Sequence, residues 1–289
     1  MTLIGVLLAL IAERALGHLP GFGEPVPLRL YLRALRKLIH IPPLWRSWFA
    51  PLLAAAPVVA LVAWAQHEIV MPLPHLALST VVLFLCLGPR DLADDITRLL
   101  AARGAGDDAT VKQMTRALMR SAEPESNRED LLGALFIQSH ERLFGVLLWF
   151  FAGGAAGAVA YRVASRLPRL FNEQQPDTVA EQSAVALHTA LAWVPARLTA
   201  MLYGMAGSMD DAMRDWRRLH AEGSADWRSR TWALLAEVSG AALSVEESHS
   251  GPAAPASLDA CLREVQSMQT RALLILLAGF AFFTIGQLV

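Results

Sequence analysis

Cysteine and charge are both scarce in this chain of 289 residues. Its two cysteines, Cys86 and Cys261, lie far apart in the sequence, which supports neither a disulfide framework nor a zinc site. Charged residues make up 18% of the chain, against about 25% in an ordinary soluble domain. The 25 Lys and Arg are matched by 26 Asp and Glu, whereas nucleic-acid-binding domains show a basic excess. The composition therefore predicts no nucleic-acid partner.

Common catalytic signatures are missing as well. The sequence has no GxxxxGK[ST], GxSxG, HExxH or EF-hand pattern, which removes the usual nucleotide, acyl-transfer and metal motifs. The apolar start, Met1 to Ala12, has no basic region before it and no small-residue cleavage site. It is therefore expected to be retained as a membrane span rather than removed as a signal peptide.

Hydrophobic residues are abundant: they make up 54% of the chain, and the mean hydropathy is +0.38. A helix needs about 17 to 25 mostly apolar residues to cross a bilayer. The sequence predicts an all-α, polytopic bundle of five or six spans that forms a single membrane domain over residues 1–289. The candidate spans are Met1–Leu16, Trp48–Ala65, Leu73–Leu87, Leu143–Ala164, Ala184–Ala206 and Arg271–Val289.

Basic residues set the expected topology. Most of the 25 Lys and Arg fall in residues 14–46, 90–142 and 208–270, which the positive-inside rule places in the cytoplasm, with both termini outside. One connection disagrees, because Arg162, Arg166 and Arg169 would lie outside if residues 143–164 crossed completely.

Two arrangements of the 143–164 segment would remove that conflict. The segment is either re-entrant, broken at Gly153, Gly154 and Gly157, or a span whose tail is buried in protein. A full crossing is our working expectation. The GxxxG spacing from Gly153 to Gly157 also allows close helix packing, and hence a homodimer.

Further helices are expected on the cytoplasmic side. Residues 28–38 place Leu28, Tyr31, Leu32 and Leu35 opposite four basic residues, which favours an amphipathic helix in the membrane interface, in contact with lipid. The alternative is an ordinary surface helix packed on the protein. The other predicted helices start at Asp91, Ala109, Glu129, Asp210, Ala225 and Leu258. An (i, i+4) pair of Asp210 with Arg214 is expected in one of them.

Two arginines stand where a membrane span would carry none. Arg162 follows Tyr161 in one apolar run, and Arg197 follows Pro195 in the next. An arginine near the bilayer centre is unfavourable by at least about 2.5 kcal/mol, so it faces a polar cavity, a partner or an anion. A guanidinium fork suits a phosphate or carboxylate ligand. An internal partner such as Glu141 or Glu181 is an equally good explanation.

Acidic and histidine residues give weaker signals. Asp91, Asp94 and Asp95 cluster at helical spacing, and with Asp107 they could hold magnesium if a phosphate completed its shell. Helix capping and solvation explain these carboxylates better. His188 lies inside an apolar run, where hydrogen bonding to a neighbouring helix is a better explanation than a proton relay.

Four stretches carry a similarity to a known family: MTLIGVLLALIAER at 1–14, LCLGPRDLADD at 85–95, ERLFGVLLWFFAGGAAGAVAYRV at 141–163 and WVPARLTAML at 193–202. They resemble the AmpE family, bacterial inner-membrane proteins associated with regulation of β-lactamase induction. That resemblance implies a sensor or signalling modulator rather than an enzyme. It also implies a ligand derived from cell-wall fragments or their carriers.

The AmpE family is in turn similar to the CobD/CbiB membrane proteins, which join an aminopropanol unit to cobyric acid with ATP and magnesium. Two parts are shared. One is the small-residue run that ends in Tyr161 and Arg162, and the other is the WVPARLTA block, which contains Pro195 and Arg197. The synthetases have a proline where this chain has Ala155 and Ala156, and an acidic, Asn-rich patch where it has FIQSHER. An ATP- and magnesium-dependent synthetase is therefore the alternative to the signalling modulator. ATP and magnesium are expected only under that alternative, and the leading hypothesis expects no cofactor.

The leading hypothesis places a cavity for an anionic ligand between the fourth and fifth spans. Arg162 and Arg197 would bind the ligand, Tyr161 and Trp193 would supply aromatic walls, and Pro195 would free a backbone carbonyl. Glu141 and Arg142, which precede the fourth span, complete the candidate site.

Overall fold

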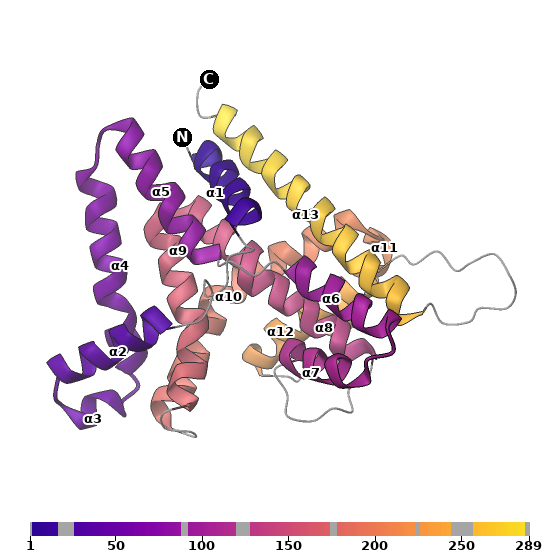
Figure 1. Ribbon diagram of the computed structural model, residues 1–289, viewed down its shortest axis with the longest axis horizontal. Helices are drawn as coiled ribbons and strands as arrows, with labels where there is room; N and C mark the ends of the chain where they lie inside the picture. Colours follow the sequence, from indigo (N-terminus) through magenta and orange to yellow (C-terminus); the bar gives the residue numbers. More distant parts are fainter. Residues whose placement is uncertain are drawn as a thin grey trace, which may run out of the picture. The chain divides into compact units, whose positions relative to one another are not determined.

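A computed structural model describes residues 2–16, 26–87, 92–119, 128–173, 178–223, 226–243 and 257–286. Every regular element in these ranges is a helix, which confirms the all-α prediction (Figure 1). The chain divides into two compact units. The first comprises Met1–Arg90 and Glu141–Pro195, and the second Asp91–His140 and Ala196–Val289.

Among the described residues, five segments are long and apolar enough to cross a membrane: Ala50–Glu68, Pro72–Gly104, Arg128–Asn172, Val179–Ala206 and Leu258–Thr284. The chain is therefore a multi-pass membrane protein. The first predicted span corresponds to α1 (Thr2–Leu16), a helix of 15 residues, which is shorter than the roughly 20 residues of a typical span.

The first unit is built around α9 (Gly145–Asn172). The helices α4 (Ala50–Glu68) and α5 (Pro72–Leu87) pack on it, and α1 packs on α5. Small residues allow close approach, since Ala50 and Ala54 of α4 are fully buried. This unit also holds α2 (Val26–Leu38), α3 (Pro42–Trp45) and the first part of α10 (Val179–Ala206).

In the second unit, α8 (Arg128–Ser139) packs on α12 (Trp227–Ala241), and α11 (Met209–Ala221) covers α12. The approach of α8 is close, because a Cβ at Gly133 would lie 3.0 Å from that of Ala236. The helices α6 (Leu92–Gly104), α7 (Asp108–Met119) and α13 (Leu258–Gly286) complete the unit. These limits agree with the predicted cytoplasmic helices to within a few residues, except that the predicted starts at Asp91 and Ala225 lie outside the described residues.

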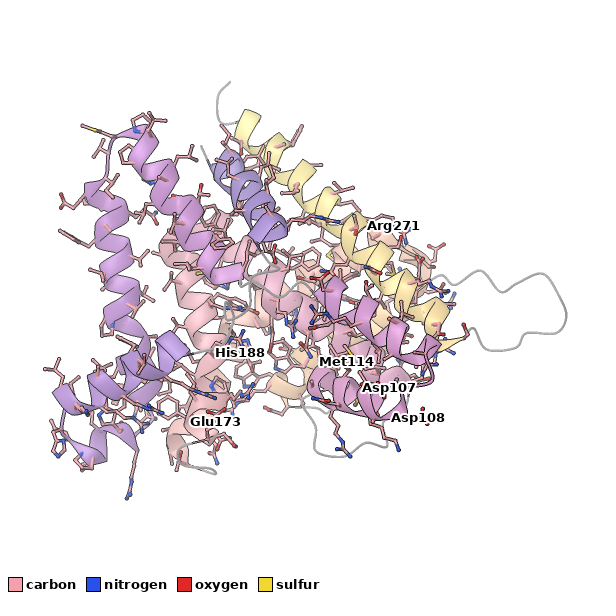
Figure 2. All side chains as sticks on the ribbon, viewed as in Figure 1. Asp107, Asp108, Met114, Glu173, His188 and Arg271 are labelled. Atoms are coloured by element: carbon pink, nitrogen blue, oxygen red, sulfur yellow. The ribbon has the colours of Figure 1, made fainter. Side chains whose placement is uncertain are left out.

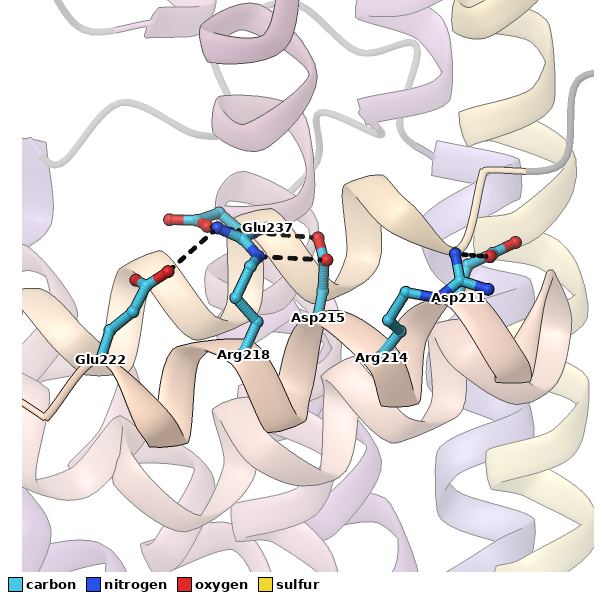
Figure 3. A network of polar contacts seen from close by, with 6 residues as sticks. All are labelled: Asp211, Arg214, Asp215, Arg218, Glu222 and Glu237. Atoms are coloured by element: carbon cyan, nitrogen blue, oxygen red, sulfur yellow. Dashed lines mark hydrogen bonds and ion pairs between the residues drawn. The ribbon is translucent and has the colours of Figure 1, made fainter.

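Charged residues on α11 form a network that differs from the predicted pair. Arg214 contacts Asp211 at 2.8 Å, three residues away, so the expected pair with Asp210 is wrong. Arg218 contacts Asp215, Glu222 and Glu237, which links α11 to α12 (Figure 3). Asp215 and Glu237 raise the pKa of Arg218 above its ordinary value.

The helix α9 reverses direction in its middle. Gly154 has φ 63° and ψ −151°, and these angles break the helix. A Cβ at Gly157 would collide with the carbonyl oxygen of Trp149, and one at Gly145 with the ring of Tyr161. Residues 16 apart in one straight helix would be about 24 Å apart. The segment is therefore a helical hairpin with arms 145–153 and 155–172.

This hairpin corrects the working expectation of a straight crossing. Of the two alternatives, the re-entrant segment broken at the glycines agrees with the structure. The close approach that the GxxxG spacing predicted also occurs, between the two arms of one chain at Gly157 and Trp149. The predicted homodimer remains a prediction.

The ends of the second arm locate it beside α4. Near the reversal, Gln66 Oε1 accepts a hydrogen bond from the Ala156 amide at 3.2 Å. At the other end, Arg29 of α2 contacts Glu173 at 2.8 Å. Residues 162–173 therefore lie on the side of the first basic connection, so their predicted external position is wrong. Arg162, Arg166 and Arg169 therefore lie on the same side as the basic residues of that connection.

The amphipathic helix α2 packs on the protein. On its apolar face, Leu32 is 3% exposed and Leu35 is 9% exposed, and Tyr31 donates a hydrogen bond to the Ala54 carbonyl at 3.0 Å. Burial raises the pKa of the Tyr31 phenol. The apolar face of α2 therefore packs on the protein and not in the acyl boundary, whereas contact of its basic face with lipid remains a prediction.

Candidate functional site

A π-helical turn, η1 (His140–Phe144), precedes α9 and carries the first polar residues of the site. Such turns insert one residue into a helix and are frequent at functional sites. Glu141 of this turn is 7% exposed, although it is flanked by the apolar runs of α8 and α9. A buried carboxylate needs compensating partners, because desolvation disfavours its charge.

Tyr161 lies against Gly145, four residues after Glu141, because the hairpin brings the second arm back. Its side chain is fully buried, and its ring occupies the space above Gly145, where no Cβ could fit. Gly145 therefore serves a packing function that its position inside an apolar run does not reveal. The expectation that Tyr161 forms an aromatic wall of a ligand cavity remains a prediction.

His188 of α10, which is labelled in Figure 2, completes a buried group with Glu141 and Tyr161. Its Nε2 lies 3.9 Å from Glu141 Oε1, and its ring centre lies 5.8 Å from that of Tyr161. The side chain is 6% exposed. His188 therefore contacts a neighbouring helix, as the preferred explanation from sequence required.

Arg162 lies about halfway along the second arm, eight residues after Gly154, or about 12 Å along the helix. The guanidinium is half-buried, and Nη2 donates to the Leu87 carbonyl at the end of α5, at 3.2 Å. That bond uses one of five N–H donors. The charges of Glu141 and Arg142 both act on Arg162. We call Glu141, Arg142, Tyr161, Arg162 and His188 the Arg162 cluster.

Pro195 is buried inside α10, and the prediction that it frees a backbone carbonyl is supported by one specific contact. A proline removes the hydrogen bond to the carbonyl four residues earlier, which here belongs to Leu191. The Trp149 indole donates to this carbonyl at 2.9 Å. The freed acceptor therefore joins the first hairpin arm to α10 and is already used within the protein.

The remaining residues predicted for the cavity are divided between the two units. Trp193 is 44% exposed in the first unit. Arg197 belongs to the second unit, where it is half-buried and interacts electrostatically with Arg230. A meeting of Arg162 with Arg197 therefore remains a prediction.

Among the acidic residues proposed for magnesium, Asp107 has a clear structural role as a helix cap. Asp107 accepts hydrogen bonds from the Thr110 amide and hydroxyl at 3.1 and 2.5 Å, which caps α7 and lowers the pKa of the carboxyl. Asp94 is exposed and Asp95 is 8% exposed. Asp91 lies outside the described residues. Within the described residues, His, Cys, Asp and Glu form no group of three or more that could hold a metal ion.

Sequence reasoning missed two buried polar contacts in the second unit. Tyr203 donates to Ser139 at 2.7 Å, and His140 Nδ1 lies 2.9 Å from the Thr199 hydroxyl. Both connect the end of α8 and the start of η1 to α10. The available signal was the run Ser139, His140, Glu141 and Arg142 between two apolar stretches.

Comparison with known proteins agrees with these features. The family described as "Regulatory signalling modulator protein AmpE" matches residues 1–289. The chain belongs to the AmpE family. This AmpE-family protein is also similar to two proteins named cobalamin biosynthesis protein CobD. No solved structure matches it.

The two CobD proteins differ in how much of the AmpE-family chain they match. The one from Chromobacterium violaceum is 27% identical over 227 residues, which is 73% of this chain and 71% of the relative. The one from Stutzerimonas stutzeri is 27% identical over 142 residues, which is 47% of this chain and 47% of the relative. The resemblance to both families stated from the sequence is thereby confirmed.

Proposed function

We propose that this protein is an inner-membrane modulator of β-lactamase induction and cell-wall stress that binds an anionic ligand at the Arg162 cluster. Membership of a family of regulatory signalling modulators supports the signalling part of the proposal. The ligand class, cell-wall fragments or their lipid carriers, comes from the family resemblance.

The observation that carries the proposal is the half-buried guanidinium of Arg162 in the middle of a hairpin arm. With His188 neutral, two arginines and one glutamate give the cluster an excess of one positive charge. The like charge of Arg142 acts unfavourably on Arg162. A bound anion would relieve this repulsion, and it would accept hydrogen bonds from donors of the guanidinium that the Leu87 carbonyl does not use.

The experiment replaces Arg162 by alanine and measures β-lactamase induction by a β-lactam in cells that depend on this protein. We expect Arg162→Ala to insert normally and to lose its effect on induction. Arg197→Ala should do the same if Arg197 faces the same ligand. Arg169→Ala is the matched control, because Arg169 lies on the same arm in an exposed pair with Glu173, and such pairs contribute little.

Binding is measured on purified protein with two probes, a soluble muropeptide and undecaprenyl phosphate. Arg162→Ala should weaken binding of at least one probe by tenfold or more. Normal induction with both Arg162→Ala and Arg197→Ala would contradict the proposal.

The second candidate function is an ATP- and magnesium-dependent amide ligase of the CobD/CbiB type. The similarity to the Chromobacterium violaceum protein over 227 residues supports it. The capping by Asp107 and the sequence departures at Ala155, Ala156 and FIQSHER weaken it. Purified protein would be incubated with candidate carboxylates and amines, ATP and magnesium. A magnesium-dependent amide product would favour this function over the first, and failure to bind ATP would eliminate it.

A further inference from the structure

The helix α2 uses only one face to pack on the first unit. Leu32 and Leu35 are buried on that face. The opposite face exposes Leu30, Arg33 and Lys37, three residues at helical spacing. The basic face is therefore available for a function other than folding.

Three contacts hold α2 in place. Arg29 Nη2 donates to both carboxylate oxygens of Glu173 at 2.9 and 2.8 Å, and Tyr31 is bonded to the Ala54 carbonyl. The Arg36 guanidinium lies over two aromatic rings, 5.1 Å from the centre of Trp45 and 5.6 Å from that of Phe171. The basic face is thus preorganised, which lowers the entropic cost of binding.

The exposed face of α2 is hollowed. A cavity of about 700 Å³ is lined by Leu30, Arg33, Ala34, Arg36 and Lys37. Three of these residues are cationic, and burial lowers the pKa of Arg36. In the described part of the chain, Arg36 Nε is buried without a hydrogen-bond partner. The cavity therefore combines positive charge and an unused donor with two apolar side chains.

No carboxylate interrupts this charge along the chain. From Pro25 to His67 the sequence has neither Asp nor Glu. Glu173, which approaches from α9, is engaged by Arg29 and Arg169. The surface is consequently suited to an anion.

The neighbouring aromatic residues indicate which anion. Trp48 and Phe49 immediately precede the apolar helix α4, are exposed by 59% and 47%, and stack with ring centres 3.6 Å apart. Exposed tryptophan at the end of a span is typical of the headgroup level of a bilayer. An anion that meets the basic face at that level belongs to a lipid.

We infer that α2 and the turn into α4 bind the phosphate of an anionic phospholipid, with Arg33, Arg36 and Lys37 around the phosphate and Leu30 against the glycerol and acyl region. The site is separate from the Arg162 cluster. Its occupant is a membrane lipid with a net negative headgroup, which distinguishes it from a zwitterionic lipid with the same phosphate. Binding should weaken as salt rises, because exposed charges are screened.

The test measures lipid binding to the full-length protein by native mass spectrometry in detergent, with phosphatidylglycerol and phosphatidylcholine of the same acyl chains. We expect preferential binding of phosphatidylglycerol, reduced about tenfold in Arg33→Gln/Lys37→Gln. The matched control is Arg217→Gln/Arg263→Gln, which removes two exposed cations from α11 and α13 and should retain the preference.

Three outcomes would overturn the inference: equal binding of the two lipids by the unaltered protein, equal loss in both double variants, or no loss in Arg33→Gln/Lys37→Gln. A fourth outcome would also overturn the inference: displacement of the lipid by soluble glycerol phosphate at a concentration equal to that of the lipid. Such displacement would show that the site binds a free phosphate group and does not require a membrane lipid. Because the readout is lipid binding, a normal or lost induction phenotype does not affect the result.

Discussion

At the level of single residues, the contact between Gly145 and Tyr161 offers the most direct test of the hairpin. A methyl group at position 145 would overlap the buried ring of Tyr161. We expect Gly145→Ala to lower stability by about 1–3 kcal/mol, the range for overpacking a filled core. The thermal midpoint of the purified protein in detergent measures this loss.

Gly153→Ala is the control for that substitution. Gly153 lies in the same arm, and a Cβ there would meet no atom within 4 Å. Its midpoint should stay near that of the unaltered protein. Equal midpoints for the two variants would contradict the packing of Tyr161 on Gly145.

A second residue-level prediction concerns the carbonyl of Leu191. Trp149→Phe removes the indole donor to it, which should lower stability by about 1 kcal/mol. Alanine at position 195 restores an amide that can bond this carbonyl within α10. The cost of Trp149→Phe should therefore shrink in a Pro195→Ala background, as measured by a double-mutant cycle. Strictly additive effects would argue against the shared acceptor.

At the level of elements, the cap of α7 gives a prediction for pH. Hydrogen bonds from Thr110 lower the pKa of Asp107. The ionised cap therefore stabilises the helix fully at pH values above the ordinary carboxyl pKa of about 4. This stabilisation is lost as the pH falls through the lowered pKa. Amide exchange in the first turn of α7, corrected for intrinsic rates, should accelerate in that acid range.

Asp107→Asn tests that assignment, because an asparagine cap does not titrate in this range. Its first turn should show no such acceleration. The start of α12 is an internal reference, since the side chain at its N-cap, Asp226, makes no capping bond. Identical acid profiles for Asp107→Asn and the unaltered protein would assign the effect to another group.

Hydrophobic periodicity and capping residues located most helices, but they could not reveal the π-helical turn. Helices such as α7 and α11 begin and end close to their predicted limits because their signals are local. The turn at His140–Phe144 depends on contacts with distant residues such as His188 and Thr199. The sequence therefore named Glu141, Arg142, Tyr161 and Arg162 as site candidates but did not predict the position of His188 beside Glu141.

At the level of the whole molecule, the reversal at Gly154 predicts a topology that labelling can check. His40 and Arg169 are exposed near α2 and the end of α9, and Met71 is exposed between α4 and α5. In oriented vesicles, a membrane-impermeant maleimide should reach His40→Cys and Arg169→Cys from one side and Met71→Cys from the other. Both native cysteines are buried, so background labelling should be low. Labelling of Arg169→Cys from the side of Met71→Cys would contradict the hairpin.

Charge counting conflicted with a straight crossing at one place, and that conflict is informative. The conflict at Arg162, Arg166 and Arg169 arose from treating residues 143–164 as a straight helix. Apolar composition alone does not distinguish one helix from two arms of a hairpin, because both bury the same residues. Three glycines indicated a break, but only the contacts of Gly145 and Gly157 show that the chain turns back.

The hairpin also limits how the chain can change in length. Gly145 faces Tyr161 and Gly157 faces Trp149 across the turn at Gly154, and one inserted residue rotates everything after it by about 100° around the helix axis. An insertion between Gly154 and Tyr161 would therefore turn Tyr161 away from Gly145 and Arg162 away from the carbonyl of Leu87. The connection between α4 and α5, where Val70 and Met71 are exposed, should tolerate variation in length far more readily than residues 145–172.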